Sequence, residues 1–469
     1  MRRAGWWATG LALVFAFFLS DNLLRTPVQR SDSLELILDA QRSPSAAATF
    51  ATTVAAPGYM RPLFRVENKL LFDVGGVSSL QWAYRGFHAC LLTLGLLLFA
   101  RAARVTTERD FAAFAMAMAV LVGLHTFRGA VGEAYPVNHY LNVAVVCLLT
   151  LVLAQSSGGV WIDAAAAAGL VYSIFILETG VLVWVIAGAS WLVGWRGISS
   201  RALAAMTALL LAYVYLRFGY LPVGVPSLSE RSSGFLFSVL DPPELVRRFG
   251  DRPAPFYAYN VVTSMLSVLF SEPRAGRFVA VDAWRQDALL PRMLLALFTS
   301  LVTTCVIGHA AVRCWKARRL DDNARYVAVF AAVLAGNSLL SFAYTKDEIM
   351  LPAGIFYALA AYAGARVLFE SMAVARLRPA PVAIAIALAV ISTGWTVRAA
   401  GVPYFQRSQA FKHRGDWGQL AGELRRGGRE DHLPSDERHL IDRLRDDALA
   451  AAAPNPRFEP RWARLVWED

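Results

Sequence analysis

Long apolar runs dominate this chain and constrain its fold more than any other feature. Crossing roughly 30 Å of hydrocarbon takes about 20 helical residues, and about eleven runs have that length and composition. They cover residues 5–23, 80–100, 110–126, 139–155, 161–177, 180–195, 202–219, 289–312, 326–343, 349–369 and 380–398. With 56% of its 469 residues hydrophobic and 17% charged, the chain is too apolar for one soluble core. The sequence predicts an all-α polytopic membrane protein with about 11 transmembrane helices.

The longest apolar stretch runs from Trp161 to Trp195. It is too long for a single crossing, because an α-helix rises about 1.5 Å per residue. Glu178, Thr179 and Gly180 form the only polar or flexible break near its middle. We therefore expect a hairpin of two helices that turns at these three residues, at a membrane surface.

The distribution of basic residues orients the chain. Lys and Arg concentrate in the cytoplasmic loops of membrane proteins, and the densest cluster here lies at 313–325. This cluster is cytoplasmic only if the moderately apolar segment 255–270 does not cross, so we predict an interfacial or re-entrant segment there. The N-terminus is then cytoplasmic and the C-terminus extracytoplasmic. Two long loops, at about 21–80 and 220–288, also lie outside.

Two domains are predicted. Residues 1–399 form the transmembrane domain, and residues 400–469 form a small extracytoplasmic C-terminal tail. Within the tail, residues 435–451 combine a capping serine, early acids and leucines at helical spacing, which predicts an amphipathic helix. No small-residue cleavage site follows Phe18, so we interpret the first apolar run as an uncleaved anchor.

Composition argues against several classes of protein. The net charge of +11 does not indicate nucleic-acid binding, because the basic residues are scattered in short clusters between apolar runs. The four cysteines lack metal-ligand spacing, and His125 and His139 are interpreted as structural hydrogen-bonding residues. We expect no metal and no cofactor, although Asp32, Glu35 and Glu133 can share an ion from different loops. Abundant Arg and Ala indicate a GC-rich bacterial genome, and hence the bacterial inner membrane.

Polar side chains gather where the predicted helices meet the outer surface. Transfer of a sugar from a lipid-linked phosphate at that surface needs a carboxylate base for the acceptor hydroxyl and cationic partners for the phosphate. The candidate residues are Asp32 as the catalytic base, with Glu35, Arg61, Arg128, Glu133 and Lys346 as substrate-binding groups. Structural roles are the alternative: a helix N-terminus at Asp32, a snorkelling anchor at Arg61 and a self-neutralising cluster around Lys346.

A series of short motifs follows in order along the chain. The motifs are Gly58-Tyr59-Met60-Arg61-Pro62-Leu63 with Asn68, Leu71-Phe72, Tyr84 and His88, then His125 to Glu133, Leu177-Glu178-Thr179-Gly180, Tyr344 to Pro352, and Gln406-Arg407 with Trp417. In this order they resemble the motifs of the GT-C membrane glycosyltransferases, and especially those of the protein O-mannosyltransferases and their tetratricopeptide-bearing relatives. The resemblance extends over nearly the whole membrane region.

This resemblance implies a GT-C-like fold and transfer of a sugar from a polyprenyl-phosphate donor to an extracytoplasmic glycan, lipid or protein. Its implied partners are the lipid bilayer, the donor and the acceptor. Asp32 takes the position of the family's first-loop catalytic acid. The family usually has two adjacent acids there, whereas Ser33 follows Asp32 and Glu35 comes three positions on. The tail also lacks the repeats of the tetratricopeptide-bearing relatives.

Other functions fit the same sequence. An O-antigen-type polysaccharide polymerase or ligase also has many spans and large outer loops, and it relies on outer-loop arginines, here Arg247, Arg248 and Arg252. A transporter or a non-catalytic membrane protein is the third alternative. Transporters tend to show duplicated halves and broken helices at the bilayer midplane, whereas we find no repeat, and the ionisable residues gather at the outer surface.

Overall fold

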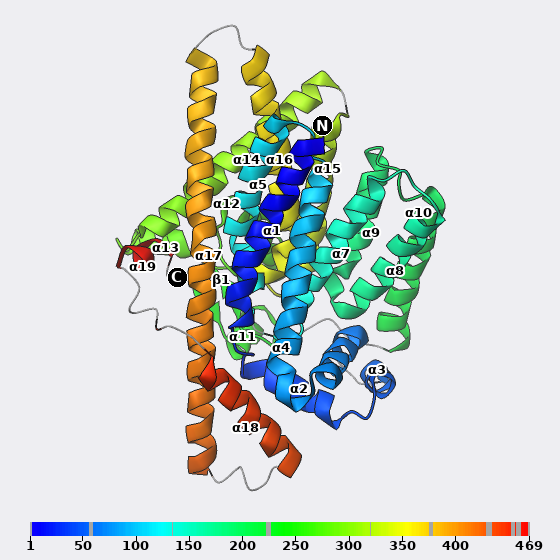
Figure 1. The fold of residues 1–469 in the computed structure, drawn as a ribbon, viewed down its shortest axis with the longest axis vertical. Coiled ribbons are helices and arrows are strands. Elements are labelled where there is room, and N and C mark those ends of the chain that lie inside the picture. Colours follow the sequence, from blue (N-terminus) through cyan, green and yellow to red (C-terminus); the bar gives the residue numbers. More distant parts are fainter. Residues whose placement is uncertain are drawn as a thin grey trace.

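The computed structural model is a bundle of helices (Figure 1). It describes residues 2–55, 60–133, 135–221, 227–318, 320–374, 379–427, 434–451, 455 and 461–467. The bundle contains α1 (Arg2–Leu24), α4 (Pro62–Ala103), α5 (Glu108–Gly123), α7 (His139–Ala154), α8 (Val160–Ile176), α9 (Leu182–Leu192), α10 (Ser200–Val214), α14 (Pro291–Ala317), α15 (Asp322–Leu340), α16 (Leu351–Val374) and α17 (Pro379–Gly427). The described residues form one small sheet, the hairpin of β1 (Ser233–Phe235) and β2 (Ser238–Leu240). The predicted all-α class is confirmed.

Within the described part of the chain, seven helices are long and apolar enough to cross a membrane. These segments are Arg3–Leu24, Pro62–Ala103, Ser200–Tyr220, Pro291–Ala317, Asp322–Leu340, Asp347–Met372 and Pro381–Leu420. An eighth results if α5 and α6 (His125–Gly132), which meet at 57°, count as one broken span. The prediction of about eleven spans therefore exceeds what length and composition support. Three predicted spans correspond to α7, α8 and α9, which have only 16, 17 and 11 residues.

Burial accounts for the short α7, most of which is buried, but not for α8, most of which is not buried. α16 is the central helix, with 89% of its most apolar window buried, compared with 22% for the segment that contains the peripheral α10. It packs against α5, α14 and α15, while α7 packs against α4, α8 and α9. A helix enclosed by other helices does not have to match the hydrocarbon thickness, so its apolar run can end early.

The connections that follow α4, α7 and α14, all predicted to be cytoplasmic, lie together at one end of the bundle. Gln155 and Tyr326 both donate hydrogen bonds to the carbonyl oxygen of Ala102, over 3.2 and 2.6 Å. Arg104 forms an ion pair with Asp322 over 3.8 Å. We call this the inner end of the bundle.

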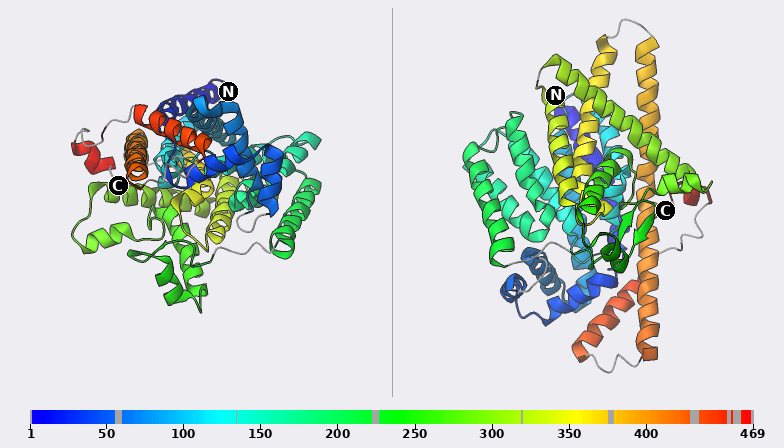
Figure 2. Two further views of the ribbon diagram at one scale, coloured as in Figure 1. Left: turned by 90° about the horizontal axis from the view of Figure 1, so that it is seen from below. Right: turned by 180° about the vertical axis from the view of Figure 1, so that it is seen from behind.

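The opposite end, the outer end, carries α2 (Ser31–Arg42), α3 (Ala46–Ala55) and α18 (Ser435–Ala450) (Figure 2). α4 reaches it through a kink at Gly76, whose φ of 55° favours glycine. A separate hydrophobic core holds this end together. It contains Val28, Ile37, Ala40, Phe72, Leu80, Tyr84, Trp417, Leu440, Ile441, Leu444 and Ala448. Parts of the predicted first outer loop and of the tail therefore fold as one unit.

α17 connects the bundle to this outer unit. Its 49 residues extend over about 73 Å, well beyond the thickness of a bilayer. The predicted domain boundary between residues 399 and 400 falls inside α17. Beyond that boundary, the Trp417 indole donates a hydrogen bond to the carbonyl oxygen of Val28 over 2.7 Å. Arg42 of α2 pairs with Glu437 of α18 over 2.8 Å.

Two local predictions are confirmed. A short 3-10 turn, η1 (Glu178–Val181), separates α8 from α9, as expected for the hairpin. α18 (Ser435–Ala450) matches the predicted tail helix in its bounds, but the predicted capping serine is wrong, because Pro434 is the N-cap and no side chain caps the helix. In the second long loop, α11 (Pro242–Phe249), α12 (Ala254–Phe270) and α13 (Val279–Arg285) follow the β-hairpin. α12 packs against α14 and α15, and its interfacial position stays a prediction.

Candidate functional site

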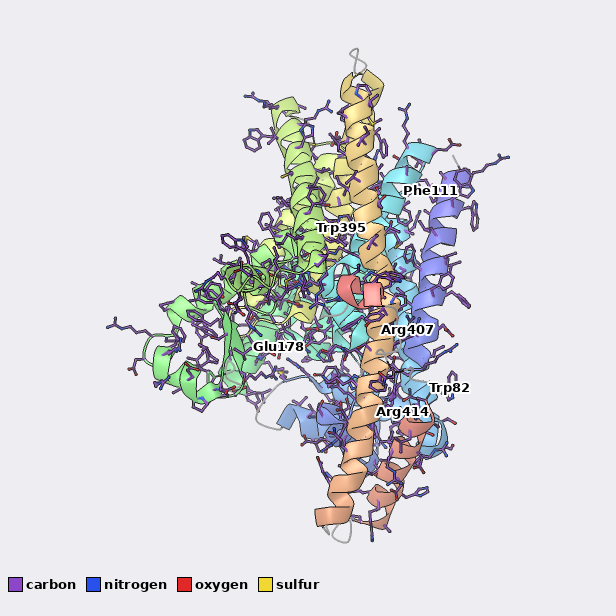
Figure 3. The ribbon with its side chains drawn as sticks, turned by 90° about the vertical axis from the view of Figure 1, so that its left-hand side faces the viewer. Trp82, Phe111, Glu178, Trp395, Arg407 and Arg414 are labelled. Carbon is purple, nitrogen blue, oxygen red and sulfur yellow. The ribbon has the colours of Figure 1, made fainter. Side chains whose placement is uncertain are left out.

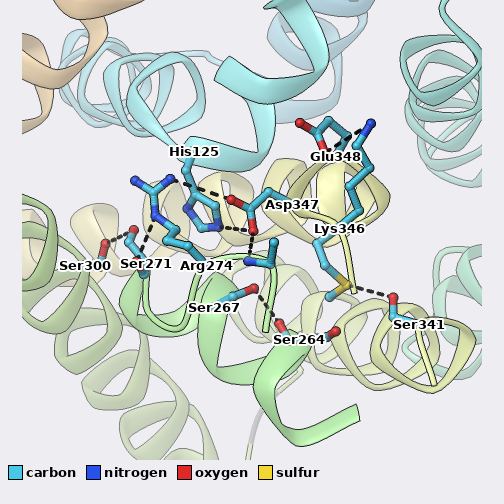
Figure 4. A network of polar contacts seen from close by, with 12 residues as sticks. His125, Ser264, Ser267, Ser271, Arg274, Ser300, Ser341, Lys346, Asp347 and Glu348 are labelled. Atoms are coloured by element: carbon cyan, nitrogen blue, oxygen red, sulfur yellow. Dashed lines mark hydrogen bonds and ion pairs between the residues drawn. The ribbon is translucent and has the colours of Figure 1, made fainter. Parts of the chain in front are cut away.

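A cavity of about 330 Å³ lies where α5 ends and α14 begins. Its walls come from α6, α13, α14, α17, the segment after α12, η3 (Asp347–Met350) and the C-terminal α19 (Arg461–Trp467). The charged or titratable residues that line it are His125, Arg128, Glu272, Arg274, Arg292, Asp347 and Arg398. Figure 4 shows part of this network, with His125, Arg274 and Asp347 directed toward one another. The topology thus brings together arginines from four separate parts of the chain.

Arg398 is held in the middle of α17 by neutral groups. Its guanidinium lies 4.0 Å from the ring centroid of Trp395, which Figure 3 labels. It donates hydrogen bonds to the hydroxyls of Thr299 (2.8 Å), Ser300 (3.1 Å) and Ser271 (3.1 Å). Among the described residues, no carboxylate forms an ion pair with Arg398. A half-buried cation without a counter-ion favours an anionic ligand.

Three more arginines line the cavity. Arg292, in the first turn of α14, has no hydrogen bond or ion pair with any described residue. Arg274 Nη1 lies 3.7 Å from Asp347 Oδ2. The Arg128 guanidinium lies 4.9 Å from the ring centroid of Phe405. Guanidinium groups bind phosphate oxygens well because their planar donors match the geometry of the anion.

Two acids share the cavity with the arginines. Asp347 accepts a hydrogen bond from the backbone N–H of Ala275 over 2.8 Å, and Glu272 accepts one from Ala280 over 2.9 Å. Burial raises the pKa of Glu272 to about 7, so this carboxyl is partly neutral near physiological pH. Among the described lining residues, four guanidinium groups face two carboxyl groups, and this part of the lining is cationic.

His125 lies inside this cationic site. Its side chain is 1% exposed, and neither ring nitrogen has a hydrogen-bond partner among the described residues. The nearest acid is Asp347, whose Oδ1 lies 3.9 Å from Nε2. The structural hydrogen bond predicted for His125 is therefore absent from the described residues. Its charged neighbours include Arg128, Arg274 and Arg398, and guanidinium groups can only donate hydrogen bonds.

The cavity also has an apolar side. Met293 and Leu297 of α14 line it together with Val466 and Trp467 of α19. On the side of α14 that faces away from the bundle, the large apolar side chains Leu294, Phe298 and Leu301 are 51%, 50% and 50% exposed. A site with guanidinium groups on one side and a helix with exposed apolar side chains on the other fits an amphiphile with an anionic head group.

Two predicted substrate-binding residues pair with each other instead of lining this cavity. Lys346 forms an ion pair with Glu133, and its Nζ lies 3.8 Å from Glu348 Oε2. The ammonium group also lies over the rings of Tyr135 and Tyr140, at 5.7 and 5.3 Å from their centroids. This arrangement corresponds to the self-neutralising cluster that was the structural alternative for Lys346.

Arg61 is also paired within the protein. Its Nη2 lies 2.6 Å from Glu178 Oε2, in the turn between α8 and α9. Glu178 additionally accepts a hydrogen bond from Arg217 over 3.2 Å. A carboxylate between two guanidinium groups fixes the start of α4 to this turn. Arg128 is thus the one predicted substrate-binding residue that the structure places among the described lining of the cavity.

The predicted catalytic base lies on a different part of the molecule. Asp32 is in the first turn of α2, although its side chain lies outside the described residues, and Glu35 is exposed on the same helix. Trp417 donates a hydrogen bond to Val28, which lies shortly before α2. Along the axis of α17, Trp417 lies about 28 Å beyond Arg398. The structure therefore does not bring α2 to the described lining of the cavity.

Sequence reasoning missed Arg292, Arg398 and Glu272, and it placed Asp347 in a motif without a role. A signal for the arginines was present. Arg292 begins one apolar run and Arg398 ends another, both on the side predicted to be extracytoplasmic. Arginine at that end runs against the positive-inside rule, so each exception points to a functional or structural requirement.

The arginines of the alternative hypothesis lie elsewhere. Arg247, Arg248 and Arg252 are exposed, and the first two pair with Glu244 of the same helix, α11. Within the described residues, no three His, Cys, Asp or Glu side chains are grouped closely enough to hold a metal ion. The cationic cavity is therefore the strongest candidate site.

Comparison with known proteins adds no family to this description. No protein-family model, no curated protein and no solved structure matches the chain significantly.

Proposed function

We propose that this chain is a membrane glycosyltransferase of the GT-C type, which moves a sugar from a polyprenyl-phosphate donor to an extracytoplasmic acceptor. The observation that supports the proposal is the cavity with four guanidinium groups on one side and a helix with exposed apolar side chains on the other. A lipid-linked sugar phosphate combines an anionic group with a long apolar chain. The acceptor is a glycan, a lipid or a protein.

The cavity residues suit the departure of the phosphate. In the transfer step the bond between sugar C1 and a phosphate oxygen breaks, while a bond forms between C1 and the acceptor oxygen. Negative charge grows on the departing phosphate, and hydrogen bonds from Arg292 and Arg398 stabilise it. The acceptor hydroxyl loses its proton to a base. The resemblance assigns this base to Asp32, whereas His125 and Asp347 lie in the cavity itself.

We propose that about eleven crossings, with the N-terminus in the cytoplasm, place the outer end of the bundle in the periplasm of a bacterial cell. α7, α8 and α9 then cross as short helices. In this orientation the cavity lies near the outer membrane surface, where the phosphate of a lipid-linked donor resides. The donor phosphate then neutralises the arginines of the cavity, which would otherwise be costly near the membrane.

Donor binding and transfer by charge-neutralising variants test the proposal. The wild-type protein in membranes is expected to bind a polyprenyl-phosphate sugar and to transfer its radiolabelled sugar. Arg398→Gln is expected to weaken donor binding about tenfold or more, because a charge-assisted hydrogen bond contributes about 1.5–3 kcal/mol. Arg201→Gln is the matched control, since Arg201 is exposed at the inner end of α10. Wild-type protein that binds no such donor contradicts the proposal.

The same assay compares the two candidate bases. If Asp32 is the base, Asp32→Asn abolishes transfer while donor binding and expression stay at wild-type levels. If the proton goes to the pair in the cavity, His125→Gln abolishes transfer and Asp32→Asn does not. The distance between α2 and the cavity favours the second result, and the family resemblance favours the first.

A polysaccharide polymerase or ligase is the second candidate. Four arginines in one cavity carry enough positive charge for a diphosphate, which is the group that links oligosaccharides to their lipid in those reactions. The arginines of α11 are exposed and partly paired, so the cavity is the better place for that donor too. Supplying a diphosphate-linked oligosaccharide in the same assay separates the two functions.

A further inference from the structure

The C-terminal helix α19 returns from the outer unit to the cavity. Its last residues, Val466 and Trp467, line the cavity together with α14 and α17. We propose that α19 forms the wall of the donor site that contacts the first isoprenoid units of the lipid, so that the tail selects the donor by its chain. This inference rests on the proposed function and names the part of the substrate that the tail recognises.

Trp467 is fixed in place on α17. Its indole Nε1 donates a hydrogen bond to the carbonyl oxygen of Val397 over 2.9 Å, directly before Arg398. The ring packs against Gly401, where a Cβ atom would lie only 2.6 Å from an indole carbon. A side chain at position 401 therefore displaces the indole. Position 401 requires glycine because the ring approaches so closely. The backbone conformation does not require it, since α17 is helical at this position.

The surroundings of Trp467 suit an isoprenoid chain. Arg398 follows Val397, so a phosphate held by Arg398 places the beginning of its lipid next to the indole. Met293 and Leu297 continue the apolar wall, and Phe298 is 50% exposed on the outer face of α14. These side chains all lie on α14, so apolar groups of one helix are present both in the cavity and on the surface of the bundle. Large aromatic rings contribute much apolar contact area to such a wall.

Two variants remove this wall in different ways. Gly401→Val displaces the indole and leaves Trp467 in the sequence, whereas Trp467→Ala removes the ring. Gly415→Val is the control for the first, because no atom lies within 4 Å of a Cβ at position 415 of the same helix. Trp82→Ala is the control for the second, since Trp82 is 66% exposed on α4.

The measurement is the affinity of each protein, in detergent micelles, for a long polyprenyl phosphate and for methyl phosphate, which has the head group and no isoprenoid unit. We expect both test variants to lose about tenfold in affinity for the long-chain phosphate, on the scale of the apolar contact removed. Affinity for methyl phosphate is expected to change less than twofold, because the arginines that hold the phosphate remain. The controls are expected to match wild type for both phosphates.

The outcomes separate this inference from the proposed function. Equal losses for both phosphates, or no loss for either, overturn the role of α19 while the cationic cavity stands. A gain in affinity on losing Trp467 also overturns it, because α19 then blocks the site instead of completing it. Wild-type protein that binds neither phosphate contradicts the proposed function itself.

Discussion

At the scale of single residues, Glu272 determines how the charge of the cavity varies with pH. Its pKa is raised to about 7 mainly by burial, so the carboxyl is neutral in mildly acidic solution and charged above neutrality. The donor phosphate is a diester and does not titrate in this range. We therefore expect donor affinity to fall roughly three- to tenfold between about pH 6 and pH 8, because a carboxylate then repels the phosphate.

Glu272→Gln tests this assignment, since glutamine keeps the shape of the side chain and cannot ionise. Isothermal binding measurements at several pH values should show a flat profile for the variant and a falling one for wild type. His125 and Asp347 also face the cavity and stay unchanged in the variant. If the variant keeps the wild-type slope, the titrating group is another one.

The candidate site was only partly predictable from the sequence, and the reason lies in how residues pair. Arg128, Arg61 and Lys346 look alike in a sequence, as cations near the outer ends of apolar runs. The fold gives Arg61 and Lys346 carboxylate partners, and it places Arg128 in the cavity. Which cation lines the cavity depends on contacts between distant segments, and no local pattern records them.

At the scale of elements, the kink in α4 depends on one glycine. Gly76 has φ 55° and ψ 176°, a conformation that side chains rarely adopt. Gly76→Ala is expected to destabilise the fold by about 1–3 kcal/mol. The free energy lost should appear as a lower unfolding temperature in detergent.

Gly86→Ala, in the helical second half of α4, is the matched control. No atom lies within 4 Å of a Cβ at that position, so the added methyl meets no obstacle. Alanine also favours the helix over glycine by about 1 kcal/mol. Equal unfolding temperatures for the two variants would mean that alanine adopts the backbone conformation of residue 76 without strain.

Elements were easier to predict than the site, because their signals are local. The turn after α8 follows from one polar break in an apolar run, and α18 follows from its early acids and its leucine spacing. The kink at Gly76 and the extension of α17 beyond the bundle were not predicted. Both lie against the outer unit: Phe72 and Leu80, on either side of Gly76, belong to its core, and Trp417 of α17 donates a hydrogen bond to Val28.

At the scale of the whole molecule, the inner and outer ends of the bundle differ in structure, and their orientation in the membrane can be measured. Single cysteines introduced into a chain without the four native ones report which end an impermeant maleimide reaches. Ser45 and Ser435 are exposed at the outer end, and Ser157 is exposed at the inner end. We expect Ser45→Cys and Ser435→Cys to react on intact cells, and Ser157→Cys to react only after lysis.

We expect this orientation because most basic loop residues lie at the inner end of the bundle. Two arginines near the outer end are exceptions, and both line the cavity. Arg104 and Arg325 lie at the inner end among other loop arginines, as the positive-inside rule requires. Arg292 and Arg398 lie nearer the outer end, where the rule disfavours them, and both line the cavity. If Ser157→Cys reacts on intact cells, the orientation is the opposite of the one expected, and the cavity faces the cytoplasm. A lipid-phosphate donor would then be used at the cytoplasmic face, so this one measurement decides on which side of the membrane the proposed transfer takes place.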